Sequence, residues 1–224
     1  MVAGMAVELL RPILTVDVVL LTVSDGELRV VLQKRDRQPH SGKPALIGGY
    51  VRPEEDSSTS GAAIRVLRDK AGVQSSFIDQ FMTFSGGDRD PRGWSASVAY
   101  YALTPIERIP VGDPSLTLLP LSKARGLPFD HDEIVAKAIE RWKRRSAYSS
   151  LPAFLLGETF TLPALRMAYE KMLGRALNDS AFRRKIDELR IIKPVAGAIS
   201  KATARPAQLY QLSNPRLTEF ERTL

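Results

Sequence analysis

A short basic stretch late in the sequence has the spacing of a surface that contacts a polyanion. Its polar residues are Ser180, Arg183, Arg184 and Lys185. In a helix expected over residues 181–189, Phe182, Ile186 and Leu189 would form the buried stripe. At about 100° per residue, Arg184 and Ser180 then point furthest from that stripe, with Arg183 beside them. The sequence therefore predicts a helix with one buried face and one basic face.

The basic face suits contact with DNA. Arginine bound to guanine is the commonest specific contact between proteins and DNA bases. We therefore expect Ser180, Arg183 and Arg184 to reach base edges. Lys185 lies at the edge of the buried face and is better placed to reach a phosphate. A solvated basic helix is the alternative.

The elements expected around this stretch are those of a winged helix-turn-helix. A preceding helix would begin at Thr161, a good N-cap with Pro163 in the first turn, and end at Gly174. Strands expected over 191–195 and 208–212 would follow the basic helix as a hairpin. This order is typical of a winged helix-turn-helix module, and the hairpin favours DNA contact over a solvated surface.

Three more residues of this module are candidates for DNA contact. Lys201 and Arg205 lie between the two expected strands, where they would touch the DNA backbone or the minor groove. A flexible charged loop is the alternative for both. Thr161 is first a helix cap, and a phosphate contact would be its second role.

Cations also gather in the first half of the chain. Lys34, Arg35 and Lys43 flank the glycine pair Gly48-Gly49 and could bind a pyrophosphate. Singly, each is more often a surface charge. The elements expected to hold them are strands over 15–20 and 28–32 around a turn at 24–26, a helix over 57–71, strands over 82–84 and 95–103, and a helix from 131 to about 146. Strands that surround helices predict an α+β sandwich in about the first 130 residues.

Composition limits the class of protein. The chain has 224 residues, of which 44% are hydrophobic and 25% charged, as in proteins that bury a core. No apolar run approaches the ~20 residues of a membrane span, and we see no secretory signal, so we expect a cytoplasmic protein that does not enter membranes. With 0 cysteines there are no disulfides or thiolate metal sites.

Charge divides the chain unevenly. Residues 151–224 hold 12 basic and 7 acidic side chains, whereas residues 1–150 hold 20 and 18. A basic segment on a nearly neutral body suggests a polyanion-binding module joined to another domain. The polar segment 146–152 ends in a proline and is the expected boundary. We therefore expect a first domain over 1–150 and a second over 151–224.

The glycine pair begins a motif that resembles an altered Nudix box. Gly49-Tyr50-Val51-Arg52-Pro53-Glu54-Glu55 is followed by Arg65-Val66-Leu67-Arg68-Asp69-Lys70-Ala71-Gly72-Val73. The family pattern has Gly, five residues, Glu, seven residues, then Arg-Glu-apolar-x-Glu-Glu-x-Gly-apolar. Here nine residues separate Glu55 from Arg65. The three helix glutamates are replaced by Val66, Asp69 and Lys70.

These replacements remove the carboxylates that pyrophosphate hydrolysis needs. Divalent cations neutralise the phosphoryl oxygens and activate water, and carboxylates usually hold them. Residues three and four apart share a helix face, and here that face carries one apolar group, one carboxylate and one ammonium. We therefore expect the Nudix fold without catalysis, metal or catalytic residues. A sharper hypothesis is that Lys70 itself contacts the pyrophosphate; a solvated charge is the alternative.

A wider resemblance, from about residue 12 to 212, is to the Nudix-related transcriptional regulators of NAD metabolism, the NrtR family. In the first domain it lies in Leu32–Arg35, Thr83-Phe84, Asp88–Gly93, Ser97–Tyr100 and Phe129–Ile134. In the second it lies in Phe160–Leu162, Tyr169-Glu170, Leu173–Arg175, Phe182–Lys185 and Arg205–Tyr210. One departure is that Leu189-Arg190-Ile191-Ile192 lacks the glycine often seen after the recognition helix, which bears on the orientation of the wing.

The resemblance implies a Nudix-like α/β/α sandwich followed by a winged helix-turn-helix. It also implies a repressor that binds palindromic double-stranded operator DNA as a homodimer. Binding of ADP-ribose or a related NAD-derived nucleotide would release the DNA, and no cofactor would be required. An active ADP-ribose pyrophosphatase with a basic accessory domain is one alternative, and a scaffold protein without an operator is another.

The candidate ligand-binding residues are Lys34, Arg35, Lys43, Arg65, Lys70, Asp90, Arg92 and His131. For Arg65, pairing with a nearby carboxylate such as Glu55 is favoured over ligand contact. Asp90 and Arg92 lie in a polar loop and would contact a ribose or the dimer partner. His131 would bind ligand or support the start of the helix that follows it.

Overall fold

Strand β1 (Ile13–Ser24) lies at the centre of the first half of the fold. The computed structural model describes residues 11–200, 206–221 and 223. Successive side chains of a strand point to opposite faces, so β1 contributes Val16 and Val18 to one hydrophobic core and Val19 and Leu21 to another. The strand is therefore buried on both faces.

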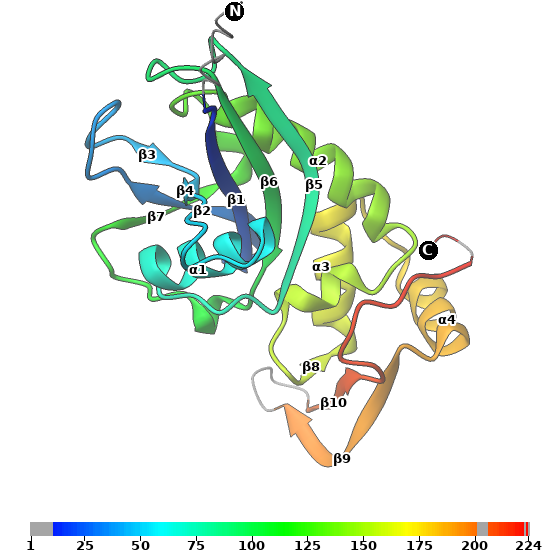
Figure 1. Ribbon diagram of the computed structural model, residues 1–224. Helices are drawn as coiled ribbons and strands as arrows, with labels where there is room; N and C mark the ends of the chain where they lie inside the picture. The colour runs from blue at the N-terminus through cyan, green and yellow to red at the C-terminus, as the bar shows by residue number, and fades with distance from the viewer. Residues whose placement is uncertain (1–10, 201–205, 222, 224) are drawn as a thin grey trace, which may run out of the picture.

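A mixed sheet forms the middle layer around β1 (Figure 1). Its other strands within the described residues are β2 (Glu27–Lys34), β3 (Pro44–Ala45), β4 (Ile47–Tyr50), β5 (Phe77–Gly86), β6 (Ser95–Leu103) and β7 (Leu116–Pro120). The order is β3-β2-β1-β6-β5, with β4 paired to β1 and β7 to β2. The β1–β2 hairpin turns at Asp25 and Gly26, both at positive φ, as the turn prediction required.

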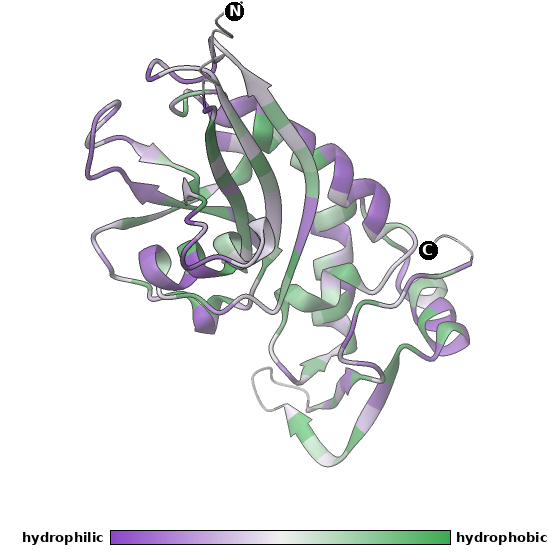
Figure 2. Cartoon of the chain, viewed as in Figure 1, coloured by the Kyte–Doolittle hydropathy of each residue, from purple (hydrophilic) through white to green (hydrophobic). Residues whose placement is uncertain are grey.

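One helix covers each face of the sheet. Helix α1 (Thr59–Ala71) packs Ala63 and Val66 on the core that contains Val16. Helix α2 (His131–Ser146) packs Ile134 and Trp142 on the opposite core. Figure 2 shows the hydrophobic strands between these helices and the hydrophilic last turns of α2. The predicted α/β/α sandwich is confirmed.

A smaller helical unit follows. It contains a short 3-10 helix, η3 (Leu151–Leu155), then β8 (Phe160–Thr161), α3 (Leu162–Leu173), α4 (Asp179–Leu189), β9 (Ile192–Ser200) and β10 (Ala207–Leu212). The small sheet has the order β8-β10-β9. Thr161 caps α3 by accepting from the Ala164 amide at 3.3 Å, and Gly174 ends α3 at φ 70°, both as predicted. This unit is a winged helix.

The segment that joins the two units is buried. Ser146, Ser149 and Ser150 are almost inaccessible to solvent. The Tyr169 hydroxyl of α3 donates to the Ser149 carbonyl at 2.9 Å, and the Ser150 amide donates to Thr218 at 2.8 Å. Met172 of α3 shares one core with Trp142 of α2, so the winged helix packs directly against α2. In the described part of the chain, no helix has the length and apolar character to cross a membrane.

Candidate functional site

A polar pocket of about 380 Å³ lies where β1, β2, β4, α1 and the start of α2 meet. Six of the eight predicted ligand-binding residues line it: Arg35, Arg65, Lys70, Asp90, Arg92 and His131. They come from four separate segments of the sequence. The fold therefore brings together most of the side chains that sequence analysis selected one by one.

Lys34 and Lys43 do not line this pocket, and the expectation for them is corrected. Gln33 and Arg35 both line it, and Lys34 between them faces the other way and is exposed because a strand alternates its side chains. Lys43 is also exposed, and its contacts are made by its backbone: its carbonyl accepts from the Arg35 amide at 3.0 Å, and its amide donates to the His40 carbonyl at 3.2 Å.

Asp17 of β1 forms the floor of the pocket. Its side chain accepts from the Ser97 hydroxyl at 2.6 Å and lies 3.5 Å from His131 Nε2 and 3.8 Å from Arg89. Burial alone would raise the pKa of Asp17, but His131, Ser97 and Arg89 together hold it below its usual value. The floor is therefore a buried carboxylate that is already fully partnered.

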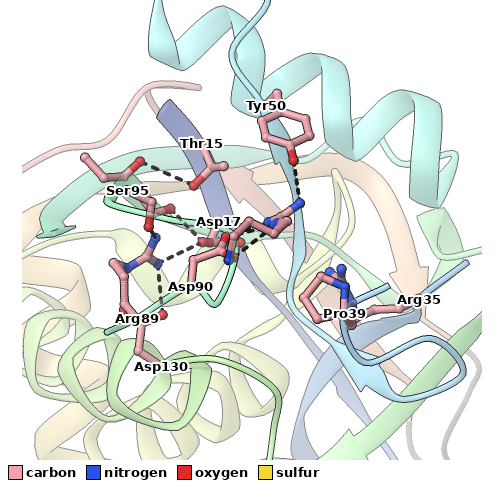
Figure 3. Close-up of polar contacts among 12 residues, drawn as sticks. Thr15, Asp17, Arg35, Pro39, Tyr50, Arg89, Asp90, Ser95 and Asp130 are labelled. Carbon is pink, nitrogen blue, oxygen red and sulfur yellow. Dashed lines mark hydrogen bonds and ion pairs between the residues drawn. The ribbon is translucent and has the colours of Figure 1, made fainter. Parts of the chain in front are cut away.

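The same floor is bonded to the first turn of α2 (Figure 3). Arg89 binds both carboxylate oxygens of Asp130 at 2.8 and 2.9 Å, and it also donates to Ser95 at 3.1 Å. His131 Nδ1 accepts from the Leu46 amide at 3.1 Å, which ties the first residue of α2 to the backbone beside β4. His131 at the start of α2 thus lines the pocket, and Asp130 before it is bonded to the lining residue Arg89.

Aromatic rings and arginines form the rim. Arg92 donates to both oxygens of the Asp90 carboxylate at 2.6 to 3.2 Å and also donates to the Tyr50 hydroxyl. Its guanidinium carbon lies 5.2 Å from the centre of the Tyr50 ring. Phe129, at φ 59°, places its ring 4.7 Å from the Arg35 guanidinium. Hydrogen bonding by Arg92 holds the pKa of Asp90 low despite burial, and burial together with the charge of Arg92 lowers the pKa of Arg35. The rim is cationic, with flat apolar surfaces beside it.

On the α1 side, Arg65 is engaged by a carboxylate that sequence analysis did not select. It binds Asp56 through two bonds of 2.7 Å, whereas Glu55 lies 3.8 Å away. The expected pairing of Arg65 is present, but its main partner is Asp56. Hydrogen bonds from Arg65 lower the pKa of Asp56 to about 2.

The Nudix-box face of α1 does not fit a metal ion. Val66 is buried in the core, Asp69 pairs with Arg68 at 2.8 Å outside the pocket, and the Lys70 ammonium donates to the Gly48 carbonyl at 2.5 Å. The described residues hold no group of three or more acids or histidines suited to a metal. A divalent cation would meet an ammonium here instead of carboxylates.

The glycine pair permits close packing at this point. A Cβ on Gly48 would lie 2.2 Å from Asp17 Oδ1, and one on Gly49 would lie 3.1 Å from Val66. Glycine at position 48 therefore allows β4 to lie directly against the pocket floor.

A second candidate surface is the exposed face of α4. Phe182 and Ile186 are buried, and Ser180, Arg183 and Arg184 are exposed, as predicted. In the part of the chain that is described, neither Arg183 nor Arg184 has a carboxylate within ion-pair distance, which leaves both guanidinium groups available. Lys185 is half-buried and lies 4.0 Å from Glu188.

Arg190 stands after α4 at the position where related proteins often have glycine, and it adopts the glycine-like backbone conformation. Arg190 adopts φ 53°, the left-handed conformation that glycine usually supplies at a helix end, and its amide donates to the Ile186 carbonyl. Its own carbonyl accepts from Ser213 at 2.9 Å, which ties the helix end to the segment after β10. The chain therefore makes the usual turn without glycine. Lys201 and Arg205 lie outside the described residues.

Sequence analysis missed Asp17, Arg89 and Phe129 as pocket residues, and Asp130 as the partner of Arg89. One signal was present: Asp17 is a charged residue in the middle of an apolar strand, and such a residue needs a buried partner. Arg89 and Asp130 are 41 residues apart, so their pairing depends on the tertiary fold.

Comparison with known proteins agrees with this architecture. Residues 152–212 match a family model described as the NrtR DNA-binding winged helix domain. An ADPR responsive transcriptional repressor, NtrR, from Acinetobacter baylyi is 34% identical over 224 residues, covering 94% of this chain and 89% of that protein. The chain belongs to the NrtR family. The resemblance seen in the sequence is confirmed.

Crystal structures of an NrtR protein show the same fold. Shewanella oneidensis NrtR in complex with a 27mer DNA has a TM-score of 0.86 and 33% identity, over 94% of this chain and 99% of that one. The NUDIX domain of the same protein in complex with ADP ribose has a TM-score of 0.55 and 33% identity, over 59% of this chain and 90% of that one. The architecture is thus a Nudix domain followed by a winged helix, as in NrtR.

Proposed function

We propose that this NrtR-family protein is a transcriptional repressor of genes of NAD metabolism that ADP-ribose or a related nucleotide releases from DNA. Residues 1–150 would form the sensor and residues 151–224 the DNA-binding domain. One observation carries the proposal: the helix that forms one wall of the polar pocket, α2, also packs against the winged helix. The relatives support it, since one is named as ADPR responsive and another was crystallised with DNA and, as its NUDIX domain, with ADP ribose.

For DNA binding, α4 would enter the major groove. Ser180, Arg183 and Arg184 would face the bases, and Lys185 and Thr161 would face phosphates. Lys201 and Arg205 would contact the backbone or minor groove. A homodimer would place two such helices on a palindromic operator, with half-sites about 34–36 Å apart or at a multiple of that distance.

For release, α2 would carry the signal. Its N-terminal end is bonded to the pocket through His131 and the preceding Asp130, and its last turn includes Arg145, which pairs with Asp79 of β5 and lies 3.3 Å from Glu219 in the segment after β10. A small displacement at one end would therefore change the position of the winged helix and the spacing of the two DNA-contacting helices.

We also propose that the pocket binds its nucleotide without hydrolysing it. The three positions of the helix glutamates carry Val66, Asp69 and Lys70, and Asp69 is already paired with Arg68. Activation of water by a divalent cation would lack its ligands. No cofactor would be needed, and the protein would act in the cytoplasm, where a repressor meets the chromosome.

A gel shift tests the repressor function. The full chain is mixed with its own upstream DNA and with promoters of NAD-biosynthesis genes, then titrated with ADP-ribose, NAD and nicotinamide nucleotides. We expect a specific complex that ADP-ribose dissolves. Arg184→Ala should weaken operator binding by ~1–3 kcal/mol. Lys123→Ala, which changes an exposed lysine in the proposed sensor domain, should leave it unchanged. Absence of any specific complex would contradict the proposal and favour a scaffold protein.

Two further measurements test the remaining parts. Light scattering should give the mass of a dimer, and a monomer at operator-binding concentrations would contradict dimeric recognition. Incubation with ADP-ribose and Mg²⁺ should release no AMP. Robust turnover would instead support the alternative, an active ADP-ribose pyrophosphatase.

A further inference from the structure

We propose that Lys70 and Arg35 bind the diphosphate of the ligand directly, without a metal ion. This inference deepens the proposed function, on which it rests, because it assigns the chemistry by which the same pocket holds a nucleoside diphosphate ester. It begins from the charge inventory of the pocket.

The buried carboxylates that line the pocket are already used. Asp17 lies with Arg89 and His131, and Asp90 with Arg92, so each would have to release a cation before it could bind a metal. Asp36 is largely exposed, and its contact with Arg37 at 3.7 Å joins two solvent-facing side chains. One solvated carboxylate is too few to hold a divalent cation, so a metal-bridged diphosphate, which the Nudix fold would otherwise imply, has no ligand set among the lining residues.

The cations that line the pocket divide into two groups. Those with a carboxylate within 4.0 Å are Arg37, Arg52, Arg65, Arg89 and Arg92. Within the described residues, Arg35 and Lys70 line the pocket without such a partner. A diphosphate diester carries one negative charge on each phosphate, and these two cations supply matching charges.

Both cations are held in place by backbone carbonyl groups. Lys70 Nζ gives one hydrogen bond to Gly48, which leaves two N–H donors of the ammonium for a ligand. Arg35 Nε donates to Pro39 at 2.8 Å, so its terminal N–H groups stay available beside Phe129. Burial lowers the pKa of Lys70, and the charge of Arg35 lowers it further. An anion between the two groups would relieve this repulsion.

Lys70 also occupies the helix position where the Nudix pattern has a metal-binding glutamate. The ammonium would therefore neutralise phosphate charge from the place where a metal would otherwise be held. An ammonium in place of a metal ion neutralises phosphate charge but activates no water. This agrees with a receptor that leaves its ligand intact.

Calorimetric titration of the full chain with ADP-ribose, in EDTA and again in Mg²⁺, tests this inference. We expect Kd values within about twofold of each other in the two buffers. Lys70→Gln should raise Kd by about 10- to 100-fold, the usual worth of one hydrogen bond to a charged group. Lys43→Gln, an exposed lysine outside the pocket, is the matched control and should bind like the unchanged protein.

Adenosine, which lacks both phosphates, is the second probe. Lys70→Gln should not change adenosine binding, so an equal loss for both ligands would show that Lys70 shapes the pocket and would overturn the assignment. Wild-type affinity of Lys70→Gln for ADP-ribose would overturn it as well. Binding that requires Mg²⁺ would overturn metal-free recognition and leave the sensor function standing, whereas no binding in either buffer would contradict ADP-ribose as effector.

Discussion

The bond between Arg89 and Asp130 gives a direct test of how the pocket communicates with the winged helix. Asp130 immediately precedes α2, and its carboxylate makes no capping bond to the helix because both oxygens bind Arg89. Asp130→Asn keeps the size of the side chain and removes its charge. One amide N–H₂ group would then face the guanidinium donors, so only the amide oxygen could still accept from Arg89.

The magnitude follows from burial. The side chains of Arg89 and Asp130 are 9% and 16% exposed, so solvent screens their attraction little. Loss of one partner from a buried pair costs ~3–5 kcal/mol, and the residual exposure and the remaining bond reduce this to about 2–4 kcal/mol of unfolding free energy. Allosteric coupling free energies are typically about 1–3 kcal/mol. The cost of breaking the pair is therefore comparable with a whole coupling free energy, so Asp130→Asn is a sufficient perturbation to test this route.

The assay measures operator Kd by fluorescence anisotropy with and without saturating ADP-ribose. In Asp130→Asn we expect the ratio of the two Kd values to approach one, while the operator Kd without ligand stays close to that of the unchanged protein. Asp132→Asn is the matched control: Asp132 lies in the same turn but accepts from the amides of Gly126 and Leu127, away from the pocket. An unchanged ratio in folded Asp130→Asn, or an equal loss in Asp132→Asn, would refute this route of coupling.

Three further predictions concern stability. Trp142→Ala should lower the free energy of unfolding by ~3–5 kcal/mol in urea titrations, because the buried indole lies in the core shared by α2 and α3; a loss under about 1 kcal/mol would contradict that packing. Arg190→Gly should raise it by about 0.5–1 kcal/mol, because glycine adopts φ 53° without the side-chain penalty; a decrease would mean that Arg190 side-chain contacts outweigh the backbone cost. The pKa of Asp56 lies near 2 instead of 3.8, so its pairing with Arg65 stabilises the fold above about pH 4 and is lost as the pH falls towards 2. Asp56→Asn should flatten this acid-side decline in unfolding free energy, and equal slopes would argue against it.

The parts of the fold that sequence analysis predicted are those with local signals. The turn at Asp25-Gly26, the cap at Thr161 and the apolar stripe of α4 each depend on residues within a few positions of one another. Strand β7 was missed because it is only five residues long and ends in a proline. It exists because β2 offers an edge to pair with.

The pocket was predicted only in part for the same reason. Lys70 and Arg65 were found from a helical motif, and Arg35 from its nearness to the glycine pair. Adjacent residues of an extended chain point to opposite sides, so Arg35 lines the pocket and Lys34 does not. The sequence alone does not tell which of the two faces the pocket. The choice of Asp56 over Glu55 by Arg65 is likewise a matter of loop geometry that residue types do not encode.

A ligand shifts an equilibrium only if it binds one state more tightly than the other, so tight binding alone does not explain release of DNA. Phe129 connects the pocket to the start of α2. Its ring touches Arg35, its backbone holds φ 59°, and only Asp130 separates it from α2. The left-handed conformation costs a non-glycine residue ~1–2 kcal/mol, which is comparable with a typical coupling free energy. If the proposed dimer forms, a ligand that holds Arg35 and this turn in their present arrangement would also select one position of α2, and through it one spacing of the two α4 helices.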